Sequence, residues 1–219
     1  MTNKNAPISY QEELIVIGKA FYERNWITNA AGNFSAVICR QPLALAFTKS
    51  GIPRGSLTRS DFICLDNPSL FLEAAQPLSA EMHIHWAITS NTGAGAVLQT
   101  HSVWSTVLAD VYAEGLELEG FEVLKSLSPV TPGRDLEWVP ILENFSDSRT
   151  LAEAIGGLLK VRPELHAILL RRHGLYTWGA TVQEAAHHVE IFELLFEVLV
   201  RQLHIFSQAD RNNVCGPCS

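Results

Sequence analysis

The sequence has no uncharged apolar run approaching the ~20 residues that span a bilayer. Its opening segment, Met1-Thr-Asn-Lys-Asn-Ala-Pro7, lacks the apolar core of a signal peptide, so we expect a cytoplasmic protein with no membrane partner. Basic residues are also scarce, since 16 Lys and Arg stand against 23 Asp and Glu, for a net charge of -7. This average charge repels polyanions, which argues against a nucleic-acid partner.

Cysteine is rare, with four in 219 residues. Cys39 and Cys64 stand in strand-like apolar segments, which predicts reduced thiols in the core. Cys215 and Cys218 have the spacing of a redox pair, but no helix follows them to lower a thiol pKa. We therefore expect an ordinary tail whose two thiols can pair on oxidation.

Apolar residues are plentiful, at 47% of 219 residues, so the chain can bury a sizeable core. Nothing in its composition requires a second domain. We expect one domain over residues 1–219, with a short tail from about residue 207.

Hydrophobic periodicity predicts a mixed α/β chain. A capping box at Ser9 and Glu12 opens the first helix, Gln41-Pro42 is a plausible hairpin turn, and Ser79 is the expected N-cap of another helix. Residues 121–127 carry an apolar stripe at helical spacing. Helices are expected near 10–24, 77–90, 103–109, 148–160 and 181–206, and strands near 34–39, 43–48, 62–65, 96–98, 139–142, 166–171 and 175–178.

The segment from Gly95 to Ser105 is a candidate binding site. Its buried strand ends in Gln99, Thr100 and His101, and strand ends commonly carry binding groups. Gln99 and His101 are two residues apart and share a face of the strand, as two ligands of one metal ion must. A polar strand end with one solvated histidine is the alternative. His173 repeats the pattern after the strand near 166–171.

The loop from Thr48 to Gly55 combines small residues with the basic Lys49 and Arg54. Together with Gly32 and Asn33 it could cradle a phosphate, although a plain surface turn explains the same residues.

Two further groups of polar residues lie on expected helices. His83 and His85 point to nearly opposite sides of a helix, which predicts surface or core histidines rather than a shared ion. Glu81, in the first turn, is the better functional candidate. Glu122 stands between Phe121 and Val123, where partial desolvation could raise its pKa for acid/base work; a solvated helix carboxylate is the commoner outcome.

With these segments placed, the chain resembles the class II aldolase/adducin-head superfamily, and within it the methylthioribulose-1-phosphate dehydratases of methionine salvage. Any one marker is weak, but six occur in family order over nearly the whole chain. They are Ala31-Gly-Asn-Phe-Ser35, Thr48-Lys-Ser-Gly51, Leu78-Ser-Ala-Glu81, Ala96-Val-Leu-Gln-Thr-His-Ser102, Phe121-Glu-Val-Leu-Lys125 and Arg171-Arg-His-Gly-Leu-Tyr-Thr-Trp-Gly179.

The resemblance implies a three-layer α/β/α sandwich with a largely antiparallel sheet. It also implies a homo-oligomer, often a tetramer, with active sites near subunit interfaces. The implied reaction is zinc-dependent dehydration of a sugar phosphate, 5-methylthioribulose 1-phosphate, to 2,3-diketo-5-methylthiopentyl 1-phosphate, with one Zn²⁺ per subunit.

The resemblance also assigns roles to residues. It implies that His101 and His173 are metal ligands and that Glu122 is the acid/base. Glu81 matches the carboxylate that the aldolases use for this purpose. The residues expected around the substrate phosphate are Asn33, Ser50, Gly51 and Ser79, with Arg54 near them.

Gln99 departs from the family pattern, which has histidine at this position. A glutamine carbonyl can bind zinc but is a poorer donor than imidazole. A weakened working site, a different metal preference and a loss of chemistry all remain open. The alternative functions are a sugar-phosphate aldolase that uses Glu81 and a non-catalytic protein like the adducin head.

Overall fold

One mixed sheet organises the chain. The computed structural model describes residues 9–66, 79–127, 136–145 and 147–214, without the side chains of 206–214. The sheet has eight strands in the order β3-β2-β1-β4-β8-β7-β6-β5, and all neighbours are antiparallel except β6 and β7. The strands are β1 (Phe34–Arg40), β2 (Leu43–Thr48), β3 (Phe62–Leu65), β4 (Ala96–Thr100), β5 (Gly115–Glu119), β6 (Leu136–Leu142), β7 (Ala167–Leu170) and β8 (Gly174–Gly179).

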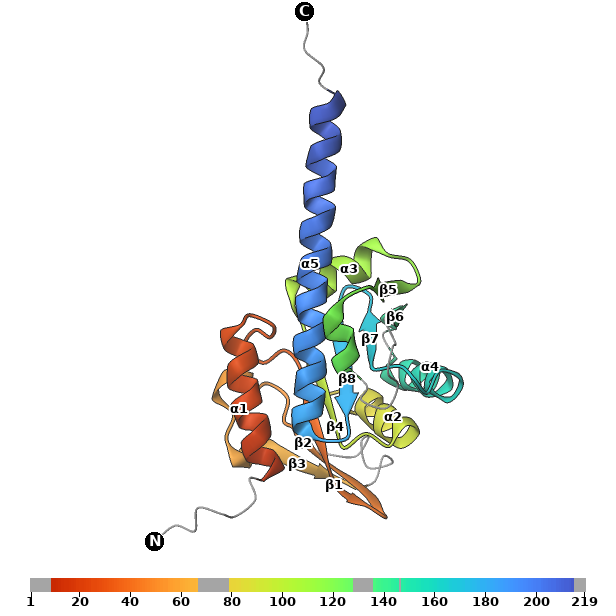
Figure 1. Ribbon diagram of the computed structural model, residues 1–219. Coiled ribbons are helices and arrows are strands. Elements are labelled where there is room, and N and C mark those ends of the chain that lie inside the picture. Colours follow the sequence, from red (N-terminus) through yellow and green to blue (C-terminus); the bar gives the residue numbers. More distant parts are fainter. Residues whose placement is uncertain (1–8, 67–78, 128–135, 146, 215–219) are drawn as a thin grey trace, which may run out of the picture.

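Helices cover both faces of this sheet. In β4, Ala96 and Leu98 pack in one apolar cluster with α1 and α5, whereas Val97 packs with α2 and α4 on the other face. This alternation confirms the predicted three-layer α/β/α sandwich. The far end of α5 projects beyond the sheet (Figure 1). The α-helices are α1 (Tyr10–Glu23), α2 (Met82–Thr92), α3 (Val103–Val111), α4 (Ser148–Val161) and α5 (Val182–Val214).

Local signals predicted most elements well. The capping box of Ser9 and Glu12 starts α1, and β1 and β2 form the hairpin expected around Pro42. The N-cap prediction for Ser79 is wrong, because α2 begins at Met82 and the Ser79 hydroxyl accepts from the backbone N–H of Glu81.

The segment between α3 and β6 also differs from the expectation. β5 pairs with β6 where only a loop was expected, and the apolar stripe after it forms a short 3₁₀ helix over Glu122–Ser126. Among the described helices, none is long and apolar enough to cross a membrane.

The prediction that Cys39 and Cys64 are core residues is wrong. Both thiols are free and exposed. Cys39 lies in the second half of β1, where three consecutive residues are exposed. Apolar neighbours in a short strand therefore did not indicate burial. Cys215 and Cys218 lie outside the described residues.

Gly174 permits the close pairing of β4 with β8. A Cβ added there would lie 2.1 Å from the backbone oxygen of Thr100. We expect Gly174→Ala to lower the free energy of unfolding by about 1–3 kcal/mol, the usual cost of overpacking.

The matched control is Gly157→Ala on α4, where an added Cβ meets nothing within 4 Å. Because alanine favours helix, this variant should gain up to about 1 kcal/mol. Urea unfolding of both variants measures the difference, and equal stabilities would contradict the steric argument.

Candidate functional site

The site lies where β4 ends and β8 begins. Their antiparallel register pairs Gln99 with Tyr176 and Thr100 with Leu175, so the residues just outside the pair, His101 and His173, lie side by side. The two imidazole rings stack with centroids 4.8 Å apart. His101 Nδ1 is 2.8 Å from the backbone carbonyl of His173. A carbonyl only accepts, so Nδ1 carries the proton and Nε2 keeps a lone pair.

Gln99 lies under the histidines and is fully buried. Its Nε2 is 2.9 Å from His173 Nε2, and its Oε1 accepts from Asn33 Nδ2 at 3.0 Å. Asn33 stands at the end of the link into β1, beside the end of β4 because β1 and β4 pair. The structure thus joins Asn33, Gln99, His101 and His173 in one contiguous group.

Arg54 is buried beneath this group, with 1% of its surface exposed. Its Nε donates to the carbonyl of Gly32, and one terminal nitrogen donates to Asn33 Oδ1 at 3.2 Å. The other terminal nitrogen donates to the carbonyls of Lys49 and Ile52, which flank Ser50 and Gly51. Burial lowers the pKa of Arg54 to about 10, so it remains a cation at neutral pH. Its role is to hold the loop and Asn33 in place.

Glu81 approaches from the start of α2. Its Oε1 lies 3.8 Å from His173 Nε2, and its buried Oε2 has no hydrogen-bond partner among the described residues. Nearby, Ser79 Oγ accepts from Asn33 Nδ2 at 3.4 Å. Burial raises the pKa of Glu81 from 4.5 to about 7. Near neutral pH this carboxyl group can therefore both release and accept a proton.

The histidines are neutral at the same pH. Burial lowers the pKa of His101 to about 4, with help from the neighbouring His173, and burial also lowers the pKa of His173. Neutral imidazole is the form that binds metals. Two imidazoles and the Glu81 carboxylate are suitable donors, although no group of three or more His, Cys, Asp or Glu arranged for an ion occurs within the described part of the chain. His101 and His173 are the side chains that could hold a metal here, with the Gln99 side chain beside them.

Among the described residues, no hydrogen bond or ion pair joins Glu122 to this group. Its side chain is 88% exposed and forms an ion pair with Lys125 at 2.9 Å. The apolar residues beside it did not desolvate it. Glu81, rather than Glu122, is the carboxyl group next to the histidines.

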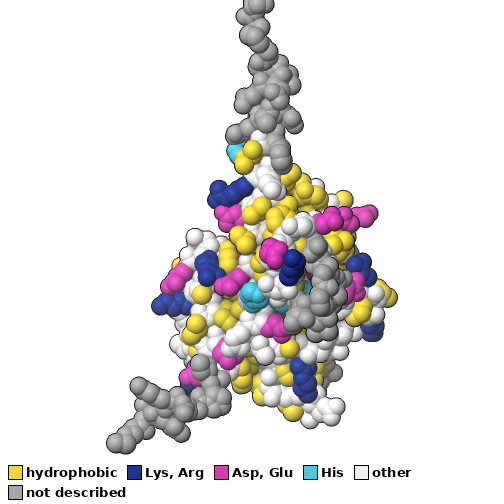
Figure 2. Space-filling model, viewed as in Figure 1, with side chains coloured by type: hydrophobic (Ala, Val, Ile, Leu, Met, Phe, Trp, Pro, Cys, Tyr) yellow, Lys and Arg dark blue, Asp and Glu magenta, His cyan; other side chains and the backbone are white. Residues whose placement is uncertain are grey.

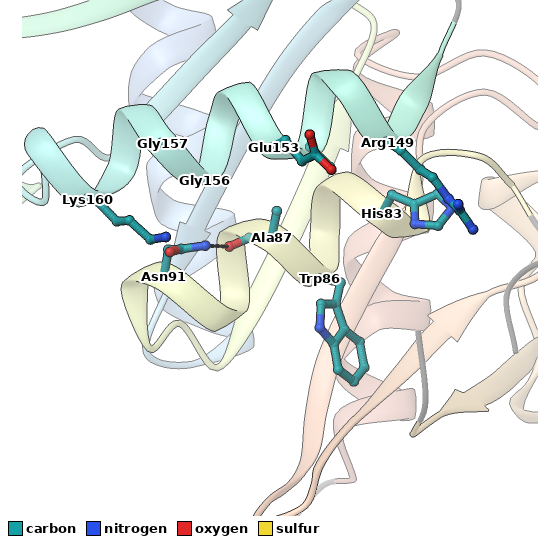
Figure 3. Close-up of a pocket in the computed structure, with 10 residues that line it drawn as sticks. His83, Trp86, Ala87, Asn91, Arg149, Glu153, Gly156, Gly157 and Lys160 are labelled. Atoms are coloured by element: carbon teal, nitrogen blue, oxygen red, sulfur yellow. Dashed lines mark hydrogen bonds between the residues drawn. The ribbon is translucent and has the colours of Figure 1, made fainter. Parts of the chain in front are cut away.

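His83 and His85 point away from each other, as helical spacing predicted. His85 is fully buried and bonds to Ser35 Oγ at 2.8 Å. His83 lines an open hollow of about 640 Å³ between α2 and α4, together with Trp86 and Arg149 (Figure 3). None of the residues that join at the histidine pair lines this hollow. On the face seen in Figure 2, histidine atoms reach the surface near its centre, close to acidic side chains.

The chain is similar to known proteins over most of its length. The model of the family "Class II Aldolase and Adducin N-terminal domain" matches residues 12–200. The chain belongs to this family. A methylthioribulose-1-phosphate dehydratase of Persephonella marina is 35% identical over 207 residues, covering 90% of this chain and 94% of that protein. The dehydratase of the same name from Pseudomonas aeruginosa is 36% identical over 196 residues, covering 89% and 95%.

Solved structures of class II aldolases share the fold of this family member. L-fuculose-1-phosphate aldolase of Thermus thermophilus superposes with a TM-score of 0.70 at 22% identity, covering 88% of this chain and 95% of the aldolase. A sugar-phosphate aldolase of Thermotoga maritima gives 0.60 at 17% identity, covering 88% and 94%. At these identities the likeness concerns the fold.

Glu193 is a buried acid that sequence reasoning missed. It lies on α5 with 1% of its surface exposed, and Thr100 Oγ1 donates to its Oε1 at 2.8 Å. Burial raises its pKa from 4.5 to about 7. Its burial could have been predicted from its position on the apolar stripe of α5, one turn from Val189 and from Phe196. It supports the end of β4 from the face opposite Gln99.

Glu193 should make stability depend on pH. Its folded pKa lies above the unfolded value, so its contribution is fully present below pH 4.5 and is lost as pH rises toward 7. Glu193→Gln stays neutral and should gain about 2 kcal/mol relative to the wild type between about pH 5 and pH 8. Urea unfolding at both pH values measures this gain. Glu190→Gln, an exposed position on the same helix, is the control, and equal pH dependence in wild type and Glu193→Gln would contradict the assignment.

Proposed function

We propose that the protein dehydrates 5-methylthioribulose 1-phosphate to 2,3-diketo-5-methylthiopentyl 1-phosphate, a step of methionine salvage. The observation that carries the proposal is the match, over about nine tenths of both chains, to relatives named methylthioribulose-1-phosphate dehydratase. The site supports it with a buried carboxyl group of pKa about 7 beside two neutral imidazoles.

The reaction needs a proton donor and a proton acceptor. A base removes the C3 proton, and its electron pair forms an enediolate with the C2 carbonyl. The C4–O bond then breaks, and a proton from an acid makes the departing hydroxide water. The remaining enol takes up a proton at C4 and loses the proton of its C3 hydroxyl, which gives the 2,3-diketone. Because hydroxide is a poor leaving group, the acid at C4 matters most.

Glu81 is the group that we propose for this proton transfer. Near its pKa of about 7 it is part protonated and part ionised, so one residue can serve as base and then as acid. Its Oε2 is buried and has no hydrogen-bond partner among the described residues, so a substrate group brought against it would meet an unsatisfied oxygen. Glu122 remains the second candidate, which would act only if substrate binding brings the exposed side chain to the site.

For the substrate phosphate we propose the loop that Arg54 anchors. Ser50 and Gly51 lie between the two carbonyls that Arg54 holds, and Asn33 and Ser79 lie between this loop and the histidines. Backbone N–H groups and hydroxyls in such a cradle suit a phosphate. Arg54 would support the cradle through its field rather than by direct contact, because it is buried.

We propose that zinc, one ion per subunit, binds through His101 and His173, with Gln99, where the family pattern has histidine, as the third candidate ligand. Such an ion supplies a Lewis acid for the C2 carbonyl. The position of Glu81 also favours a second candidate, a sugar-phosphate aldolase, because that carboxyl group is the one implied for aldolase chemistry. Product analysis separates the two reactions.

Turnover of 5-methylthioribulose 1-phosphate, followed by appearance of the diketone phosphate with zinc added, tests the proposal. We expect activity in the wild type and a loss of about 10²–10⁴-fold in Glu81→Gln. Glu122→Gln is the matched comparison, and a larger loss there would transfer the acid/base role to Glu122. Cleavage to two smaller products, or no turnover in zinc-loaded protein, would reject the dehydratase.

We also propose a homo-oligomer, a tetramer, that buries part of α3. Val103, Val107 and Val111 recur every fourth residue on this helix and are 67%, 37% and 63% exposed. Three exposed valines on one helix face are typical of a contact surface.

Light scattering on the size-exclusion column should give a tetramer for the wild type. Val107→Asp should shift it to smaller species, because a charge would be buried in the contact. Val16→Asp on α1, where the valine is 68% exposed, is the control. A monomeric wild type would contradict the proposal.

A further inference from the structure

Hydrogen bonds link four side chains in series: Arg54, Asn33, Gln99 and His173. The direction of each bond follows from chemistry alone. Guanidinium only donates, so the Asn33 atom 3.2 Å from it must be Oδ1. Asn33 therefore presents Nδ2 to Gln99 at 3.0 Å, where only Oε1 can accept. Gln99 in turn presents its Nε2 to His173 at 2.9 Å, and an amide nitrogen only donates. His173 Nε2 must be the unprotonated nitrogen that accepts.

Burial makes this order hard to reverse. Arg54, Asn33 and Gln99 are 1%, 6% and 0% exposed, so water cannot readily replace a lost partner. Turning the Gln99 amide alone would set its N–H₂ against the N–H₂ of Asn33. Turning both amides would set Asn33 against the guanidinium. Either change leaves buried donors without acceptors.

We propose that Arg54 and Asn33 are positioning residues that hold the N–H of Gln99 against the lone pair of His173, at the nitrogen that a metal would use. A divalent cation then binds only by displacing an internal hydrogen bond, and Gln99 offers its carbonyl oxygen only if its amide turns. Asn33 thus controls the metal affinity of the site as much as Gln99 does. The inference rests on the metal-binding part of the proposed function and not on the substrate.

This relay of hydrogen bonds from Arg54 through Asn33 and Gln99 to His173 gives one of the two histidines a partner within the protein. The lone pair of His173 Nε2 is satisfied by Gln99, and the proton of His101 Nδ1 is satisfied by the carbonyl of His173. His173 Nε2 therefore has a hydrogen-bond partner within the protein. A cation must bind strongly enough to offset the loss of this bond.

Asn33→Asp tests the relay. A carboxylate accepts from Arg54 with one oxygen and presents a second acceptor to Gln99, so the amide should turn and face His173 with Oε1. In metal-free protein His173 should then switch its proton to Nε2, which ¹⁵N NMR of the imidazole detects. Zinc affinity, measured by competition with a chromophoric chelator, should rise about 10- to 100-fold, as expected when a buried donor no longer has to lose its acceptor.

Ser79→Asp controls for the added charge. It places a carboxylate next to the same Asn33 amide but leaves the order from Arg54 to Gln99 unchanged, so the proton of His173 should stay on Nδ1. The inference is overturned if Asn33→Asp keeps that proton on Nδ1, or if it binds zinc no more tightly than Ser79→Asp.

The wild type provides a test that needs no variant. Its metal-free spectrum should show His173 Nε2 unprotonated and accepting a hydrogen bond, and a protonated Nε2 overturns the inference by itself. None of these measurements uses the substrate. Absence of dehydratase turnover would therefore reject the proposed reaction while leaving the relay to be judged by the imidazole spectrum and by zinc binding.

Discussion

The antiparallel pairing of β4 with β8 is the constraint on which the site depends. It brings the residue after one strand against the residue before the other, so His101 and His173 stack. The two strands can approach this closely because Gly174 has no side chain that would clash with the backbone of Thr100. Since successive residues of β4 face opposite layers, Gln99 faces the α2 side and Thr100 faces Glu193 on α5.

Burial at this strand end reverses the usual order of carboxyl and imidazole pKa values. Glu81 and Glu193 have raised pKa values, and His101 and His173 have lowered ones, mainly because each loses hydration. At neutral pH the histidines are uncharged and the carboxyl groups are only partly ionised, while Arg54 keeps its charge. The carboxyl groups can therefore exchange protons near neutral pH.

The sequence predicted what depends on local order. Period and capping signals placed α1 and the β1–β2 hairpin, and the apolar runs ahead of His101 and His173 placed both at strand ends. Properties set by contacts between distant segments were not predictable. Cys39 is exposed because the second half of its strand is not covered. Glu122 is exposed because its apolar neighbours pack against the core while its own side chain points to solvent. Resemblance to a family supplied the expected roles, but side-chain orientation came only from the structure.

Gln99 shows why a residue type alone does not define a ligand. A side-chain amide has an acceptor oxygen and a donor nitrogen. The residue that bonds to one of these atoms therefore decides which atom is presented to His173. Here that partner is Asn33, whose own direction is set by Arg54. Because the pKa of Arg54 is about 10, the guanidinium stays charged and acts only as a donor at neutral pH. The chemistry offered at His173 is therefore decided by a cation buried in a different loop.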